Sequence, residues 1–128
     1  IRIVGHASDA LLSTLYAHAM FLAMPSLYEG FGLPLVEAMS MGTPVLTSNC
    51  ASMPEVAGDA GLLVDPSDVN SISSGLLAMI MDHSLCQTLS EKAKATAARY
   101  SWGKAAEATL RIFDEAVQVR REKLYVSR

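Results

Sequence analysis

The sequence predicts an α/β fold, in which a parallel, doubly wound sheet flanked by helices is followed by an all-helical C-terminal segment. Up to residue 66, short apolar runs stopped by Gly or Pro alternate with segments whose apolar residues recur at helical spacing. Beyond Ser67 only the helical pattern continues. Alternating strands and helices favour a parallel sheet. We therefore divide the chain into an α/β part, residues 1–66, and a helical part, residues 67–128.

Four apolar runs are predicted to form the strands of this sheet. They are "IRIVG" at 1–5, "MFLAMP" at 20–25, "TPVLTS" at 43–48 and "GLLVDP" at 61–66. The second and third runs are apolar throughout, which is typical of parallel strands that are buried on both faces.

The segments between these runs carry helix signals. Ser8 is a candidate N-cap for the first helix, and Gly42 is expected to close the second. Ser52 and Glu55 have the spacing of a capping box at the start of a short helix that Gly58 ends. In the helical part, the last helix is predicted to begin after Ser101 and to turn five apolar residues inward: Trp102, Ala106, Leu110, Phe113 and Val117.

The composition favours one ordinary domain and argues against nucleic acid as a partner. The chain has 128 residues, of which 51% are hydrophobic and 18% charged, and a net charge of -3. Residues 1–90 hold one basic residue against eight acidic ones, so they have little to neutralise a polyanion. Residues 91–128 hold nine basic and five acidic residues, which we interpret as a solvated helix face because the two signs are interspersed.

The remaining global signals indicate a cytoplasmic protein. Cys50 and Cys86 are too few to suggest a disulfide framework and are interpreted as reduced thiols. No apolar run is long enough to cross a bilayer, and no signal peptide is visible. The chain lacks an initiator Met and opens directly on a strand-like run, so we expect it to be a fragment of a larger protein.

The stretch "PSLYEGFGLP" lies where an open α/β sheet binds ligands, between the end of a strand and the start of a helix. Gly30 and Gly32 allow a positive φ or a close approach of the backbone to a ligand. Pro34 suits the first position of the helix. The free N–H groups there form an anion site without a cationic side chain, and we expect no Lys or Arg near it.

Glu29 and Glu37 bracket this anion site. A carboxylate about one turn into the helix, as Glu37 would be, can accept hydrogen bonds from two neighbouring hydroxyl groups of a sugar. Glu29 would lie on the other side of a bound phosphate, so the pair suits a nucleotide sugar. From the residues alone a structural role stays equally open, because a glutamate near a helix start also complements the helix dipole.

At this point the residues resemble a known family. The run "PSLYEGFGLPLVEAMSMGTPVLTSN", with "MPEVAGDAGLLVDPSD" after it, is similar to the C-terminal domain of retaining glycosyltransferases of the GT-B fold, family 4 type. Glu29 and Glu37 match that family's Glu-x7-Glu motif, and the likeness extends from Ile1 to about Glu115. The resemblance implies a Rossmann-like sheet, of which this chain would be the latter half.

The resemblance also implies roles for single residues. Glu37 would hold the ribose hydroxyls of the nucleotide, and Glu29 would act at the donor sugar as the catalytic residue. The main-chain N–H groups of Gly30, Phe31, Gly32 and Leu33 would bind the sugar and the diphosphate. Whether Glu29 is a nucleophile stays open; we favour electrostatic support of an oxocarbenium-like state, with the leaving phosphate as base.

The resemblance implies a hexosyltransferase that needs no cofactor and no metal, with a nucleotide sugar such as a UDP- or GDP-sugar as its substrate. A sugar, a lipid-linked molecule or another acceptor would bind an N-terminal domain outside this chain, so the chain alone should be inactive. Peripheral association of the complete protein with the cytoplasmic face of a membrane stays open. Two other functions also stay open: a non-catalytic glycosyltransferase-like binding module, and a GT-B relative such as a sugar-nucleotide epimerase.

Overall fold

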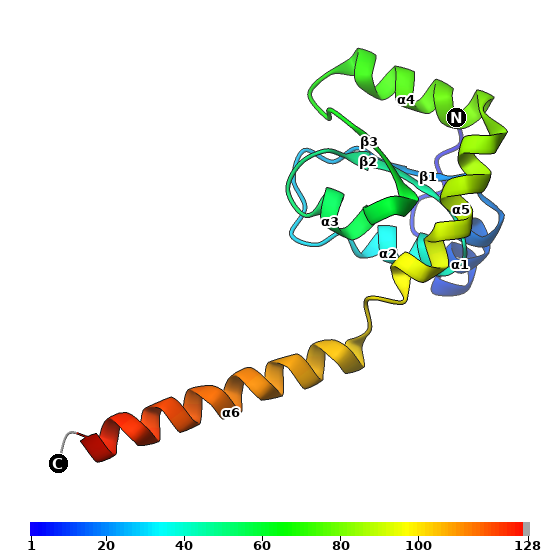
Figure 1. The fold of residues 1–128 in the computed structure, drawn as a ribbon. Helices are drawn as coiled ribbons and strands as arrows, with labels where there is room; N and C mark the ends of the chain where they lie inside the picture. The colour runs from blue at the N-terminus through cyan, green and yellow to red at the C-terminus, as the bar shows by residue number, and fades with distance from the viewer. Residues whose placement is uncertain (127–128) are drawn as a thin grey trace.

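The computed structural model describes the backbone of residues 1–126 and the side chains of residues 1–120. A three-stranded parallel sheet lies at its centre, with helices on both faces (Figure 1). Along the chain the elements are α1 (Asp9–His18), β1 (Leu22–Met24), α2 (Leu33–Ser40), β2 (Val45–Ser48), α3 (Met53–Ala57), the 3₁₀ turn η1 (Gly58–Ala60), β3 (Gly61–Val64), α4 (Val69–Met81), α5 (His83–Ala97) and α6 (Trp102–Val126). The predicted α/β fold with a helical C-terminal segment is confirmed.

The strands lie in the order β1-β2-β3, so β2 is central. Leu22 of β1 is opposite Val45 of β2, and Val45 is opposite Gly61 of β3. All four residues of β2 are buried, as its apolar run predicts. The same prediction is wrong for β1, where Ala23 is exposed. The physical reason is that β1 lies at the edge of the sheet, where the helices that enclose β2 no longer cover both faces.

Two hydrophobic cores lie on the two faces of the sheet. Side chains alternate along a strand, so Val45 packs into one core with α2 and α3, and Leu46 packs into the other with α4. Helix α5 contributes to both cores, with Ala93 in the first and Leu89 in the second. This two-sided packing holds β2 and the ends of its neighbouring strands rigidly in place.

The predicted first strand is not formed. Residues 1–8 belong to no helix or strand, and the large apolar side chains of Ile1, Ile3 and Val4 are exposed. A strand exists only when it pairs with a neighbour, and nothing within the described residues pairs with this segment. The segment therefore does not form a strand, although its apolar pattern is typical of one.

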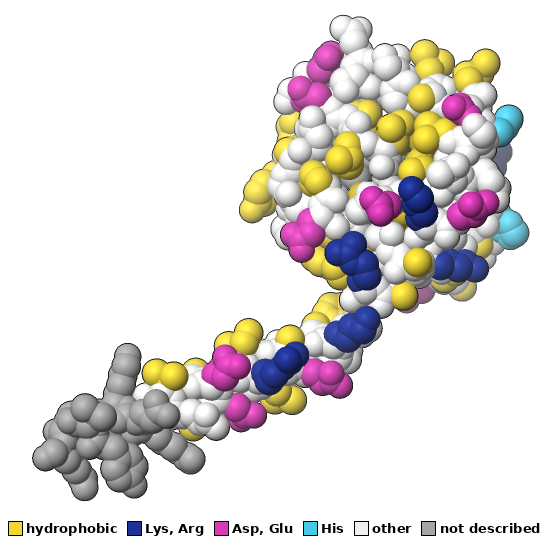
Figure 2. Space-filling view, in the orientation of Figure 1, with side chains coloured by type: hydrophobic (Ala, Val, Ile, Leu, Met, Phe, Trp, Pro, Cys, Tyr) yellow, Lys and Arg dark blue, Asp and Glu magenta, His cyan; other side chains and the backbone are white. Residues whose placement is uncertain are grey.

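Helix α6 extends away from the rest of the molecule (Figure 1). The prediction that its apolar residues face inward is wrong: Trp102 is 82% exposed and Phe113 61%. No other element among the described residues packs along α6, so both of its faces meet water. Hydrophobic, basic and acidic side chains are interspersed along it (Figure 2). The charged side chains of residues 121–128, which belong to the predicted solvated helix face, lie outside the described side chains. Among the described residues, no helix is both long and apolar enough to cross a membrane.

Candidate functional site

The candidate site is the β1–α2 loop, residues 25–32, together with the first turns of α2. Parallel strands place their carboxyl ends at one edge of the sheet, and this loop leaves the edge directly after β1. The structure brings the predicted residues together here: Glu29, Gly30, Phe31 and Gly32 lie in the loop, Leu33 begins α2, and Glu37 lies four residues further along the helix.

Gly32 makes the turn from the loop into α2. Its φ is 95°, in the left-handed region, and it occupies the N-cap position of the helix. A Cβ atom there would lie 2.5 Å from Met53 Cε and 2.8 Å from Leu35 Cδ1. Gly30, in contrast, has no other atom within 4 Å of a built Cβ. Gly32 is therefore required by both conformation and space, whereas Gly30 leaves room beside the loop.

The main-chain N–H groups at the start of α2 are free. Within the described part of the chain, the N–H groups of Gly30, Phe31, Gly32 and Leu33 donate no hydrogen bond. Pro34, at the second helical position and not at the predicted first, has no N–H to donate. The first paired N–H is that of Leu35, which donates to Gly32 O at 3.0 Å. The loop therefore presents four consecutive unpaired donors at a helix N-terminus, an arrangement that attracts anions.

The carbonyl groups of the same loop are paired with the segment that follows β2. The single hydroxyl proton of Ser52 Oγ is shared between the carbonyl oxygens of Glu29, at 3.0 Å, and Phe31, at 3.1 Å. Earlier in the loop, Cys50 Sγ donates to Leu27 O at 3.4 Å, and Ser48 Oγ, at the end of β2, donates to Ser26 O. These bonds fix the loop by its acceptors and leave its donors available.

The capping box predicted for Ser52 and Glu55 is wrong. Ser52 has helical dihedral angles, and its side chain makes no capping hydrogen bond with α3. The physical reason is that its hydroxyl is engaged by the carbonyl groups of the β1–α2 loop, more than 20 residues away in the sequence. Sequence reasoning missed Ser52 as a loop anchor because its local pattern also fits a helix cap.

The two glutamates are held differently. Glu29 is half-buried, and its Oε1 accepts a hydrogen bond from Ser26 Oγ at 3.1 Å. Glu37 is exposed, and its Oε2 accepts from the Tyr16 hydroxyl at 3.3 Å. Its other oxygen, Oε1, accepts no hydrogen bond from the described residues, so it is available to a ligand.

Tyr16 is a second residue that sequence reasoning missed. It lies on α1, and the pKa of its hydroxyl is raised by burial first, and then by the negative charge of Glu37 and the hydrogen bond to it. The hydroxyl therefore stays protonated and donates to Glu37. No local signal links the two residues, which are 21 positions apart.

The structure contradicts the prediction that no cation lies near the loop. Arg99 and Lys104 line one groove of about 550 Å³ together with Phe31 and Leu33. The guanidinium carbon of Arg99 lies 5.7 Å from the ring centroid of Tyr100. Lys104 Nζ donates to Ala98 O at 2.8 Å. Arg99 lies in the connection between α5 and α6, and Lys104 lies in the first turn of α6. Both are far along the chain, which explains why the loop's own sequence did not reveal them.

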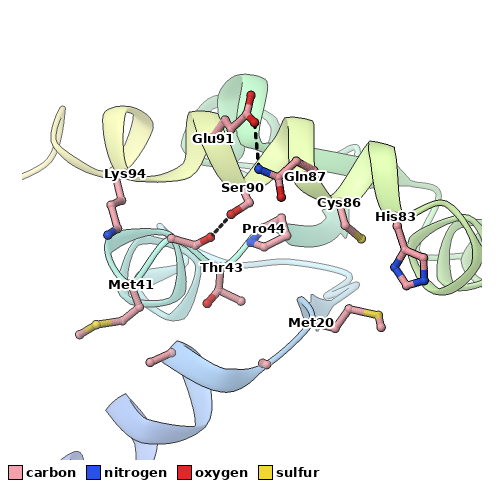
Figure 3. Close-up of a pocket in the computed structure, with 13 residues that line it drawn as sticks. Met20, Met41, Thr43, Pro44, His83, Cys86, Gln87, Ser90, Glu91 and Lys94 are labelled. Atoms are coloured by element: carbon pink, nitrogen blue, oxygen red, sulfur yellow. Dashed lines mark hydrogen bonds between the residues drawn. The ribbon is translucent and has the colours of Figure 1, made fainter.

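A second pocket, of about 650 Å³, is lined by residues that precede β1 and β2, at the amino ends of these strands; Figure 3 shows the side chains that line it. Gly42, Thr43 and Pro44, which precede β2, line it together with residues of α5. There Ser90 Oγ donates to Gly42 O at 2.7 Å. Because this pocket adjoins the amino end of β2, it is separate from the candidate site at the carboxyl ends.

The buried thiol of Cys86 lies at this second pocket. The Cys86 thiol is buried and donates to Met79 O at 2.9 Å, and its pKa is raised by burial first and then by the charge of Asp82. A protonated buried thiol of this kind is inert.

Among the described residues, no three His, Cys, Asp or Glu side chains gather into a metal site. The expectation that no metal is used stays a prediction.

A family model described as "Glycosyl transferases group 1" matches residues 1–96. The chain belongs to the glycosyl transferases group 1 family. The resemblance of "PSLYEGFGLPLVEAMSMGTPVLTSN" and "MPEVAGDAGLLVDPSD" to the C-terminal domain of GT-B glycosyltransferases is confirmed by this match and by the relatives described next.

Two curated relatives show how far the likeness to this glycosyltransferase family extends. O-antigen chain mannosyltransferase B of Escherichia coli is 48% identical over 102 residues, which are 80% of this chain and 27% of that protein. MMP alpha-(1->4)-mannosyltransferase of Mycolicibacterium hassiacum is 36% identical over 114 residues, which are 86% of this chain and 28% of that protein. The chain thus spans a little more than a quarter of the length of these relatives.

The fold of the chain is also similar to that of a solved structure. The sucrose-phosphate synthase of Thermosynechococcus elongatus superimposes with a TM-score of 0.80 at 26% identity. The superposition covers 92% of this chain and 30% of that one. The parallel sheet and its helices are therefore arranged as in a GT-B glycosyltransferase.

Proposed function

We propose that the complete protein is a hexosyltransferase and that this chain is its donor-binding domain. It would bind a nucleoside diphosphate sugar and support transfer of the sugar, with retained configuration, to an acceptor. The single observation that carries this proposal is the row of four free N–H groups from Gly30 to Leu33, which lies along the chain between Glu29 and Glu37.

The free N–H groups suit the diphosphate of such a donor. Unpaired amides and the positive end of the helix dipole attract a phosphate without a cationic side chain. Because Ser52 holds the carbonyl groups of Glu29 and Phe31, the loop need not rearrange its acceptors when an anion arrives. Such preorganisation lowers the entropic cost of binding.

The two glutamates suit the two sugars of the donor. The unpaired Oε1 of Glu37 would accept from a ribose hydroxyl, while the hydrogen bond from Tyr16 orients the carboxylate. Glu29, oriented by Ser26, would lie at the transferred sugar. There its negative charge would stabilise the oxocarbenium-like transition state, and the leaving phosphate would accept the acceptor's proton.

The rest of the proposal concerns parts beyond this chain. An N-terminal domain would bind the acceptor, and the protein would act in the cytoplasm or at the cytoplasmic face of a membrane. We propose that it uses no metal, since the sequence contains no Asp-x-Asp motif; chelation with EDTA should then leave its activity unchanged. Both curated relatives described above are named mannosyltransferases, so mannose is the transferred sugar to test first.

The test is a calorimetric titration of the complete protein with UDP, GDP and ADP, followed by transfer assays with the matching sugar donors. We expect one nucleoside diphosphate to bind more tightly than the other two, and NMR of the product to show retained anomeric configuration. Failure of all three to bind would overturn donor binding. Binding without turnover would instead favour the non-catalytic module, and conversion of the donor to an epimer would favour the epimerase.

A further inference from the structure

The connection between α5 and α6, residues 98–101, contacts the β1–α2 loop through one pair of aromatic rings. The centroids of Phe31 and Tyr100 are 5.4 Å apart, and their planes meet at 83°. This edge-to-face arrangement is the favourable geometry for two aromatic side chains. It joins two segments that are about 70 positions apart in the sequence.

Tyr100 is itself held in place from two further directions. Its hydroxyl donates to Glu55 O, in α3, at 3.1 Å. The guanidinium group of Arg99 lies over its ring at 5.7 Å from the centroid. The ring therefore cannot turn away from Phe31 without breaking a hydrogen bond and a cation–π contact.

Phe31 is consequently fixed at two points and free at a third. Its carbonyl oxygen accepts from Ser52 Oγ at 3.1 Å, and its ring meets Tyr100. Its N–H, within the described residues, donates to nothing. The two contacts restrain the segment of the loop that carries this N–H.

We propose that Tyr100 is a positioning residue for the β1–α2 loop and acts through the ring of Phe31. The inference deepens the proposed function and rests on it: Tyr100 would not touch the donor, but would keep the phosphate-binding N–H groups in their bound arrangement. Loss of the ring would let the loop sample other conformations, and the donor would then have to order the loop when it binds.

The test is a double-mutant cycle in the complete protein, with Phe31→Leu, Tyr100→Leu and the double variant. The dissociation constant of the nucleoside diphosphate that binds the wild type is measured by calorimetry. Each single variant should weaken binding about two- to tenfold, because the donor would then have to order the loop when it binds. The double variant should bind no more weakly than the weaker single variant, since the second substitution removes a contact already lost.

Two matched controls separate positioning from general damage. Tyr100→Phe keeps the ring and loses only the hydroxyl, so it should restore most of the affinity. Trp102→Leu removes another aromatic side chain from the same groove that forms no ring pair with Phe31, so it should leave the dissociation constant unchanged. The urea midpoint of every variant shows whether a loss of binding merely follows a loss of folded protein.

Several results would overturn the proposal. Additive effects of the two leucine substitutions would show that the rings act independently. An equal loss in Trp102→Leu would assign the effect to the groove as a whole. A lower urea midpoint for Tyr100→Leu with an unchanged dissociation constant would reduce Tyr100 to a structural role. If the wild type bound none of the nucleoside diphosphates, the proposed function itself would fail, which is a separate and recognisable result.

Discussion

Glu37 is exposed, and one of its two carboxylate oxygens accepts no hydrogen bond from the described residues, so it can accept one from a hydroxyl group of a ligand. We expect Glu37→Ala in the complete protein to raise the KM for the donor about 10- to 150-fold, with a smaller change in kcat. The reason is the loss of hydrogen bonds to a charged group, worth about 1.5–3 kcal/mol. Steady-state kinetics with varied donor concentration measure the effect.

Tyr16→Phe is the matched control for this prediction. It removes the hydroxyl that orients Glu37 and keeps the carboxylate, so the KM should rise much less. An unchanged donor KM in Glu37→Ala would contradict the assignment of this residue to the ribose.

Glu29 differs from Glu37 because its role is proposed at the reacting sugar. We expect Glu29→Gln to lower kcat on the order of 10²-fold, as is typical when one group that stabilises transition-state charge is lost. The dissociation constant of the nucleoside diphosphate should change little, because that ligand lacks the sugar. Ser26→Ala, which removes only the hydrogen bond to the carboxylate, should cost less. Equal losses of kcat and of nucleotide affinity in Glu29→Gln would indicate a scaffolding role.

The two glycines of the loop differ in how much room a side chain would have: Gly32 is crowded and Gly30 is not. Gly32→Ala should lower the free energy of unfolding by about 1–3 kcal/mol, because it adds a side chain at a left-handed φ of 95° and against Met53 and Leu35. Gly30→Ala meets no atom within 4 Å and should change it by about 0.5 kcal/mol or less. Urea denaturation of the two variants compares them directly; equal destabilisation would show that the loop conformation differs from the one described.

At the scale of the element, the carbonyl groups and the N–H groups of the β1–α2 loop are used differently. Its carbonyl groups bond to side chains that follow β2, and its N–H groups at the start of α2 remain free. A loop anchored only through acceptors keeps its shape without using the donors that an anion requires. In the proposed function, this division would let a site with no cation of its own in the loop be preorganised for the phosphate of the donor.

Ser52 tests this division. We expect Ser52→Ala to lower the free energy of unfolding by about 1–2 kcal/mol, and to weaken nucleoside diphosphate binding. The substitution removes the hydroxyl that donates to the partly buried carbonyl oxygen of Glu29 and to the exposed one of Phe31. Glu55→Gln should change neither quantity, because Glu55 is exposed and takes part in no capping box. If Glu55→Gln were as destabilising as Ser52→Ala, the capping interaction would be present after all.

At the scale of the whole molecule, the folded body and α6 are energetically separate. Both hydrophobic cores are built from elements up to α5, and along residues 102–120 only Ala108 is even half-buried. We therefore expect a chain ending at Ala106 to melt within a few degrees of the 128-residue chain, because it keeps both cores and the α5–α6 connection. Thermal denaturation followed by circular dichroism measures this. A fall in Tm of more than about 10 °C would mean that α6 contributes to the core.

Much of the fold and of the candidate site could be predicted because the signals are local. The central strand, the bend at Gly32 and the closely spaced pair Glu29 and Glu37 each depend on a few neighbouring residues, whose pattern specifies a backbone conformation wherever it occurs. The same dependence on local pattern gave a wrong prediction at Ser52, because the pattern of a capping box also fits a serine whose hydroxyl bonds to a distant loop. It misled again at residues 1–8 and in α6, where apolar spacing indicates a strand or a helix face but says nothing about whether a partner is present.

By itself, the sequence determined the α/β class, the order of strands and helices after residue 8, and the position of the β1–α2 loop that forms the candidate site. Only the tertiary structure decided which groups surround that loop. The bonds from Ser52 and Tyr16, the approach of Arg99 and Lys104, and the contact between Phe31 and Tyr100 each join segments at least 20 positions apart. The physical reason is that periodicity and capping are set by neighbouring residues, whereas these contacts exist only after the cores have packed the helices against the sheet.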